Sequence, residues 1–245
     1  MRKRMMAWIP LAGLSVLVLM TGCQGRGEDD AVEDSMGNVA YAAEAEDGSG
    51  FVEREFWLAL AEEPGWHLEE ARKLYMGGDA RAAADELTKV AALLKFETRH
   101  SGSEEATRRL LASVEELREV ARTIRFQEEP NWTAPNKEEL NRVEAQAFWA
   151  MGVHHLSLAE ESALAADPLM ASRYITESAN DVEMGFARAG ADPGRTMMED
   201  VADAQALATR LAEEGDGDPV AIKDSIDRLG DAINGLGEIL DSRRK

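Results

Sequence analysis

Residues 219–240, PVAIKDSIDRLGDAINGLGEIL, carry the clearest helical pattern in the chain. Their large apolar residues recur at alternating spacings of four and three, which places them on one face of an α-helix. This stripe consists of Ile222, Ile226, Leu229, Ile233, Leu236 and Leu240. An apolar helix face needs neighbouring helices to exclude water from it, so these residues predict a helix packed within a bundle.

The same spacing recurs along much of the chain after residue 51. The further stripes are Ala83, Leu87, Val90 and Leu94; Leu110, Val114, Leu117, Ala121 and Ile124; Ile175, Ala179, Val182, Phe186 and Ala189; and Met197, Val201, Ala204, Ala208 and Leu211. No segment of useful length alternates in the manner of a strand. We therefore expect an all-α fold, an antiparallel helical bundle of about seven helices.

Prolines and capping residues set the expected helix boundaries. Proline is poorly tolerated inside helices, so we expect gaps at Pro64, Pro130, Pro135, Pro168, Pro193 and Pro219. A polar side chain that accepts a hydrogen bond from an unpaired amide predicts helix starts at Asp79, Ser103, Asn136, Asp167 and Asp218. The prolines and capping residues together predict a helical half at 51–128, a loop at 129–136 and a second helical half at 137–241.

The two halves show a weak internal similarity. Residues 67–96 and 155–184 align at an offset of 88, with His67 opposite His155 and Asp79 opposite Asp167. The other identical pairs are Leu68/Leu156, Ala71/Ala159, Ala83/Ala171, Thr88/Thr176 and Ala91/Ala179. Two duplicated helical-hairpin halves would explain this pattern, although the offset was chosen by inspection and coincidence stays open as the alternative.

The first residues have the order of a secretory signal: cations at 2–4, an apolar run at 5–20, then small residues before Cys23. Residues 20–23, Met-Thr-Gly-Cys, resemble the lipobox of bacterial lipoproteins, apart from methionine in place of the usual leucine. The resemblance implies a signal peptide at 1–22, cleavage before Cys23 and acyl chains on that cysteine. An ordinary cleaved signal or an uncleaved anchor are the alternatives, but the apolar run is short for a membrane span and contains Pro10.

Residues 23–50 are acidic and rich in Gly and Ala, which predicts a disordered tether between the lipid and the helical domain. Gln24 follows the cysteine where some bacteria use aspartate to retain lipoproteins at the inner membrane. The lipobox resemblance thus implies a lipid-anchored protein of the cell envelope, at the outer membrane and facing the periplasm. The membrane is then its first partner, through the lipid anchor.

Charge and cysteine content narrow the classes of function. The formal net charge is −20, and the expected cleavage removes three cations, so the mature protein repels nucleic acid. Cys23 is the only cysteine, so no disulfide is expected and stability must come from the apolar core.

One hairpin resembles known helical families. Its residues Ala71, Leu74, Gly78-Asp79, Ala83 and Leu87 are similar to the interior of a tetratricopeptide repeat, including the Gly-Asp turn. The same short pattern resembles the YfdX-type periplasmic helical stress proteins. Both resemblances imply helical hairpins, and neither implies an active-site residue in this chain.

Four residues are candidates for contact with a ligand or partner: His67, His154, His155 and Trp132. Imidazole is a common metal ligand, but neighbouring residues on a helix point about 100° apart, so His154 and His155 are poorly placed to share one ion. Locally hydrogen-bonded packing is the alternative role for each histidine. Trp132 lies in a proline-framed loop, where it could contact a partner or cap the bundle.

Catalytic and cofactor motifs are missing from the sequence. It contains no Glu-x-x-His pair, no haem-attachment motif, no phosphate-binding glycine loop, no nucleophile elbow and no zinc-protease motif. We therefore expect no enzyme, no metal and no cofactor. The leading hypothesis is an envelope lipoprotein whose helical domain is a binding or scaffold module for a protein partner; the alternative is a small-ligand or metal-binding helical protein.

Overall fold

The computed structural model describes residues 49–126, 137–215 and 217–243, with side chains from Ala61 onward. These residues form seven α-helices and contain no strand, which confirms the predicted all-α bundle. The helices are α2 (Ser49–Met76), α3 (Ala80–Glu97), α4 (Glu104–Arg125), α5 (Lys137–Leu164), α6 (Pro168–Ala189), α7 (Gly194–Glu214) and α8 (Pro219–Arg243). None of these helices combines the length and apolarity that a membrane span needs.

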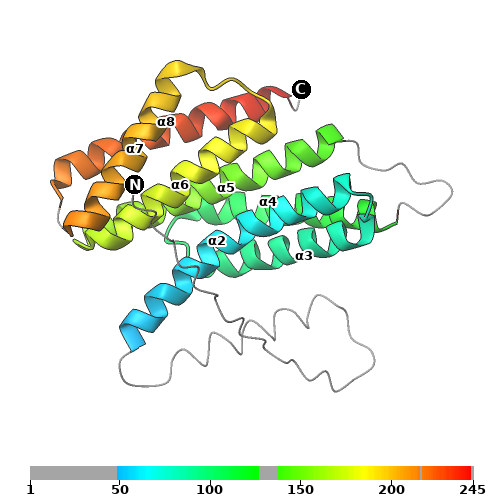
Figure 1. Ribbon diagram of the computed structural model, residues 1–245, viewed down its shortest axis with the longest axis horizontal. Helices are drawn as coiled ribbons and strands as arrows, with labels where there is room; N and C mark the ends of the chain where they lie inside the picture. The colour runs from blue at the N-terminus through cyan, green and yellow to red at the C-terminus, as the bar shows by residue number, and fades with distance from the viewer. Residues whose placement is uncertain (1–48, 127–136, 216, 244–245) are drawn as a thin grey trace, which may run out of the picture.

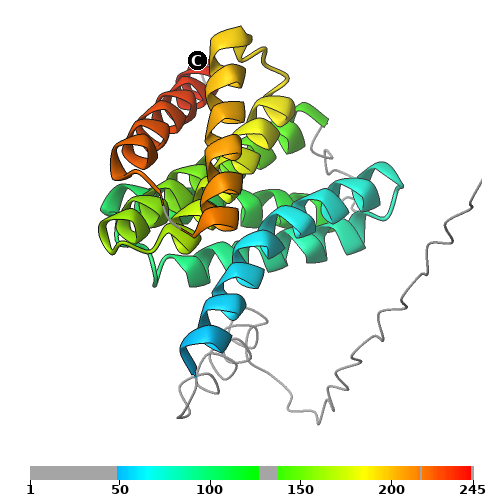
Figure 2. The same cartoon turned by 60° about the vertical axis from the view of Figure 1, so that its left-hand side comes forward.

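Helix α5 forms the centre of the bundle. Figures 1 and 2 show α2, α3 and α4 on one side of α5 and α6, with α7 and α8 on the other. One apolar cluster joins α2 to α5, and a second joins α5 to α8. Because α5 belongs to both clusters, its buried residues, such as Phe148 and Trp149, surround the helix instead of following one stripe.

The predicted stripes are the buried faces of their helices. Leu87, Leu117, Ile175 and Leu229 are each fully buried, and the other stripe residues lie beside them in the two clusters. Met197 is partly buried and packs against the second cluster.

Three predicted caps are confirmed by hydrogen bonds. Asp79, Ser103 and Asp167 each accept a bond from the backbone amide three residues ahead, at the starts of α3, α4 and α6. Asp218 Oδ1 accepts from the Val220 amide at 3.0 Å as α8 begins. Asn136 lies outside the described residues.

The predicted gap between helices at Pro64 is wrong, because Pro64 lies inside α2. Pro64 is buried. So are Ala61, three residues before it, Leu68, four residues after it, and Ala71, three residues beyond Leu68. The proline therefore belongs to the apolar stripe of α2, where burial of its ring offsets the missing amide hydrogen bond. Trp66, also on α2, is 58% exposed, whereas Trp149 of α5 is buried.

The helix boundaries fit the predicted repeat. Helices α2 and α5 begin at residues 49 and 137 and end at 76 and 164, so both ends differ by the offset of 88. Helices α3 and α6 begin at 80 and 168, again 88 apart. A duplication would produce this agreement; the duplication itself stays a prediction.

A buried ion cluster joins α2 to the central helices α5 and α6. Glu144 of α5 is fully buried, and it accepts a hydrogen bond from Arg72 Nε of α2 at 2.9 Å. Arg188 Nε of α6 lies 3.1 Å from the same carboxylate oxygen. These contacts fix α2, α5 and α6 relative to one another.

Candidate functional site

His154 and His155 lie in the middle of α5 and are both buried, with exposed fractions of 2% and 1%. Their ring centroids are 5.5 Å apart. Since neighbouring residues on a helix diverge, each imidazole meets a carboxylate from a different helix: Glu97 at the end of α3 and Asp181 in α6. The centre of the bundle thus holds two histidines and two acidic residues.

His155 and Asp181 form the tighter pair, with 2.7 Å between Nδ1 and Oδ2. Burial disfavours the imidazolium, but the charge and hydrogen bond of Asp181 outweigh it and raise the pKa of His155 to about 9. Burial also raises the pKa of Asp181, against the attraction of His155. At neutral pH we treat this pair as an imidazolium that donates to a carboxylate.

His154 and Glu97 are a looser pair. The distance between His154 Nε2 and Glu97 Oε2 is 3.7 Å, too long for a direct hydrogen bond. Burial, together with the charge of His155, lowers the pKa of His154 to about 3, so this imidazole is neutral. Burial raises the pKa of Glu97 to about 7, partly opposed by the charge of His155.

These side chains line a cavity of about 200 Å³. Its lining residues are Ala61, Glu97, His100, His154, His155, Leu158 and Tyr174. His100, just beyond the end of α3, is exposed, so the cavity reaches the surface there. The Tyr174 ring stacks on His155, with their centroids 6.4 Å apart.

Three buried polar atoms of the cavity residues have no hydrogen-bond partner within the described structure: Glu97 Oε2, His154 Nδ1 and His155 Nε2. Buried polar groups are normally paired, either with protein or with ordered water. The three atoms therefore leave unused hydrogen-bonding capacity around one cavity.

The other predicted site residues do not join this group. His67 of α2 pairs with Glu86 of α3, with 2.5 Å between Nδ1 and Oε2, and neither residue lines the cavity. Trp132 and Cys23 lie outside the described residues.

Sequence reasoning flagged the two histidines but missed Glu97, Asp181 and Tyr174. Glu97 had a signal, because it occupies the next position of the stripe that contains Val90 and Leu94. A carboxylate at an apolar stripe position indicates a buried polar site. Asp181 and Tyr174 flank the stripe of α6, and their spacing gives no comparable signal.

The chemistry available here is hydrogen bonding and charge pairing. Among the described residues, no group of three or more His, Cys, Asp or Glu side chains is arranged to hold a metal ion. The cavity instead combines a carboxylate acceptor, a neutral imidazole and an imidazolium donor, which suits a small polar molecule. Comparisons of the chain with models of protein families, with curated proteins and with solved structures found no match.

Proposed function

We propose that this protein is a lipid-anchored protein of the cell envelope whose helical domain binds a small polar molecule in the histidine cavity. The three unpartnered atoms of Glu97, His154 and His155 carry this proposal. A buried polar group without a partner costs about 1–3 kcal/mol, and a ligand that hydrogen-bonds to it recovers that cost.

The charges of the cavity favour a small zwitterion, such as the simplest free amino acids. The Nδ1 atom of His155 is engaged by Asp181, which leaves Nε2–H of the imidazolium to donate to an anionic or carbonyl oxygen. Glu97 Oε2 can accept from an ammonium group. The cavity volume of about 200 Å³ is below the usual range for pockets of drug-sized ligands, so the ligand must be small.

Ligand binding is tested by thermal unfolding of the purified full-length protein with glycine, L-alanine, acetate or methylammonium. The two zwitterions should raise the melting temperature with concentration, because they bind only the folded state, and the single-charge analogues should do so less. Glu97→Gln and His155→Gln should each abolish the shift by glycine. His67→Gln is the matched control, because it alters a histidine–carboxylate pair outside the cavity, and it should retain the shift.

Two outcomes would overturn the ligand proposal. If none of the four probes shifts the melting temperature, the cavity does not bind a small zwitterion. If His67→Gln loses the shift as fully as His155→Gln does, the effect does not come from the cavity.

The envelope location rests on the lipobox resemblance at residues 20–23. Replacing Cys23 by Ser should move the protein from the membrane fraction to the soluble periplasm, or leave an uncleaved precursor, because serine cannot carry the lipid. Cell fractionation and the mass of the processed chain measure this. Unchanged fractionation and processing would contradict the anchor. That the protein has no catalytic activity stays a prediction from its missing motifs.

A further inference from the structure

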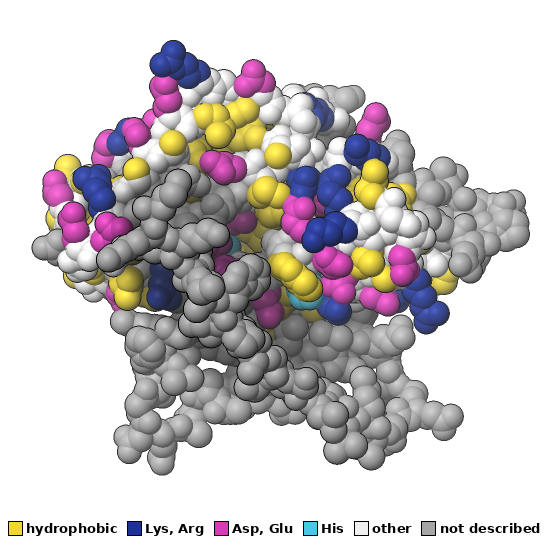
Figure 3. Space-filling view, viewed as in Figure 1, with side chains coloured by type: hydrophobic (Ala, Val, Ile, Leu, Met, Phe, Trp, Pro, Cys, Tyr) yellow, Lys and Arg dark blue, Asp and Glu magenta, His cyan; other side chains and the backbone are white. Residues whose placement is uncertain are grey.

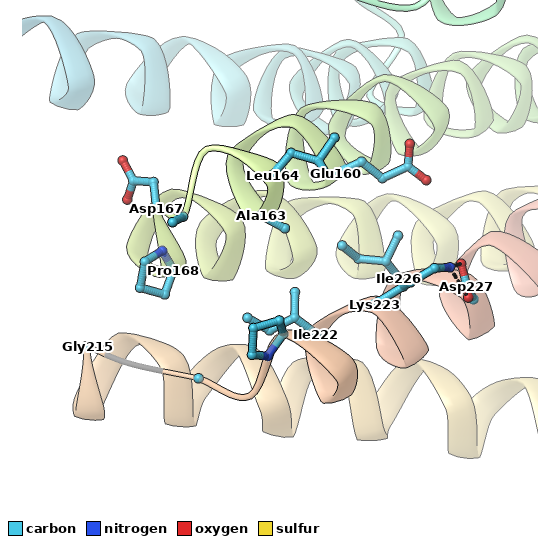
Figure 4. A pocket seen from close by; sticks show the side chains of 13 residues that line it. Glu160, Ala163, Leu164, Asp167, Pro168, Gly215, Ile222, Lys223, Ile226 and Asp227 are labelled. Carbon is cyan, nitrogen blue, oxygen red and sulfur yellow. Dashed lines mark hydrogen bonds and ion pairs between the residues drawn. The ribbon is translucent and has the colours of Figure 1, made fainter.

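A second hollow lies on the surface at the end of the bundle where α5 meets α6 and α7 meets α8. It is an open groove of about 680 Å³ (Figure 4). Apolar residues from three segments face it: Ala163 and Leu164 from α5, Pro168 from α6, and Ile222 and Ile226 from α8. The groove shares no residue with the histidine cavity and is independent of the ligand proposal.

Apolar side chains at this end are unusually exposed. Leu164 is 88% exposed and Val220, in the first turn of α8, is 74% exposed, the highest values among the large apolar residues described. An isolated exposed leucine is ordinary, but here it borders an apolar hollow. An apolar hollow bordered by exposed apolar side chains is typical of a surface that binds a partner.

The rim of the groove is acidic. Glu160, Asp167 and Asp227 line it, and the cation among the lining residues, Lys223, is paired with Asp227 at 2.6 Å. Further exposed acids at the same end are Glu161, Glu213, Glu214 and Asp218, while Asp224 is paired with Arg228 at 2.9 Å. Figure 3 shows acidic side chains at this end of the bundle, at the left of the view, with some Lys and Arg side chains among them.

Helix dipoles leave this balance to the side chains. Helices α5 and α7 end here with partially negative carbonyl ends, but α6 and α8 begin here with partially positive amide ends. The acidic character of the rim therefore comes from its carboxylates, and a partner with Lys or Arg would complement it.

We propose that this groove docks a basic amphipathic helix of another envelope protein. Such a helix offers apolar side chains to the floor and Lys or Arg to the rim. The charge argues against a second copy of this chain, since the formal net charge of each copy is −20. The same sign repels nucleic acid and anionic lipid.

The probe is a synthetic helical peptide with Leu on one face and Lys on the other, compared with a peptide in which Glu replaces every Lys. Fluorescence anisotropy with the full-length protein measures both. The Leu/Lys peptide should bind at least tenfold more tightly than the Leu/Glu peptide, and less tightly as salt rises. Hydrogen exchange should slow at the end of α5 and the start of α8 when it binds.

Variants separate docking in the groove from general attraction between a cation and an acidic protein. The double variant Leu164→Ser with Val220→Ser changes only exposed residues and should weaken binding at least fivefold. Leu111→Ser is the matched control, because Leu111 is 44% exposed on α4, away from the groove. Glu160→Gln should weaken binding, whereas Glu115→Gln, an exposed site on α4, should not.

Three results would overturn the docking proposal. The first is equal loss of affinity in the Leu111 and Leu164 variants, and the second is equal binding of the two peptides. The third is a concentration-dependent dimer that Leu164→Ser and Val220→Ser abolish while neither peptide binds, which would make the occupant a second copy of this chain.

Discussion

Two histidine–carboxylate pairs in this protein have nearly the same contact and opposite electrostatics. His67 and Glu86 join α2 to α3 with 2.5 Å between the paired atoms, and His155 and Asp181 join α5 to α6 with 2.7 Å. Yet the pKa of Glu86 is lowered, whereas the pKa of Asp181 is raised. The distance between the paired atoms therefore does not by itself decide whether the pKa of the carboxylate is raised or lowered.

Access to water and to further cations explains the difference. Burial acts to raise the pKa of Glu86, but hydrogen bonds from Lys89 and His67 outweigh burial, so the pKa is lowered. Burial raises the pKa of Asp181 more than the charge and hydrogen bond of His155 lower it. The first pair is a hydrogen-bonded contact near the surface. The second lies in the core, where Asp181, with smaller contributions from Glu97 and Glu177, keeps His155 protonated.

The largest difference should appear on removal of the carboxylates. Asp181→Asn removes the charge that keeps His155, which is 1% exposed, protonated, so the imidazole becomes neutral and the stabilisation that accompanies its raised pKa is lost. A pKa raised from 6.5 to about 9 corresponds to a loss of about 3 kcal/mol in the free energy of unfolding at pH 7, which urea denaturation measures.

Glu86→Gln is the matched variant at the other pair. The side chains of His67 and Glu86 are 15% and 14% exposed, and an amide can still accept from His67, so we expect a loss of less than about 1 kcal/mol. If both substitutions cost the same, burial is not what distinguishes the two pairs.

The predicted repeat places the two histidines, but not their partners, at equivalent positions. His67 and His155 align at the offset of 88, whereas Glu86 aligns with Tyr174 and not with Asp181. If the halves did arise by duplication, each histidine acquired its carboxylate separately. His155 of the second pair lines the histidine cavity, and neither His67 nor Glu86 does.

Sequence patterns predicted the fold well because apolar spacing reports directly on which face of a helix is buried. Leu229 and Ile175 illustrate this, since both are stripe residues that are fully buried. The predicted gap at Pro64 was wrong because a single sequence does not distinguish a proline inside a helix from a proline between two helices. Only packing shows that its ring belongs to the buried face of α2.

The candidate site was harder to predict because its members come from three helices. Glu97, His154 and Asp181 are far apart in the chain, and only tertiary packing brings them together. The pair His154-His155 was visible, and its predicted divergence explains why the two rings meet different helices. The apolar groove was not visible, because it depends on how the ends of α5 and α8 lie beside each other.

The pH dependence of stability gives a smaller effect that sharpens the same comparison. The pKa of His155 is raised from 6.5 to about 9, so its stabilising contribution is complete below pH 6.5 and is lost as pH rises through 9. Glu97 and His154, its neighbours, titrate in the folded state near 7 and 3, so His155 dominates above pH 7.5. The raised pKa of Tyr174 places its ionisation above this range.

Between pH 7.5 and 9.5 the free energy of unfolding should therefore fall, by a total on the order of 2 kcal/mol. Urea denaturation at several pH values measures this slope. Asp181→Asn should flatten it, because an imidazole without its carboxylate partner is already neutral in the core. His67→Gln should keep it. A wild-type curve that is level or rising across this range would show that His155 is not protonated, and Nε2 of His155 would then be an acceptor toward the cavity instead of the donor that a zwitterion requires.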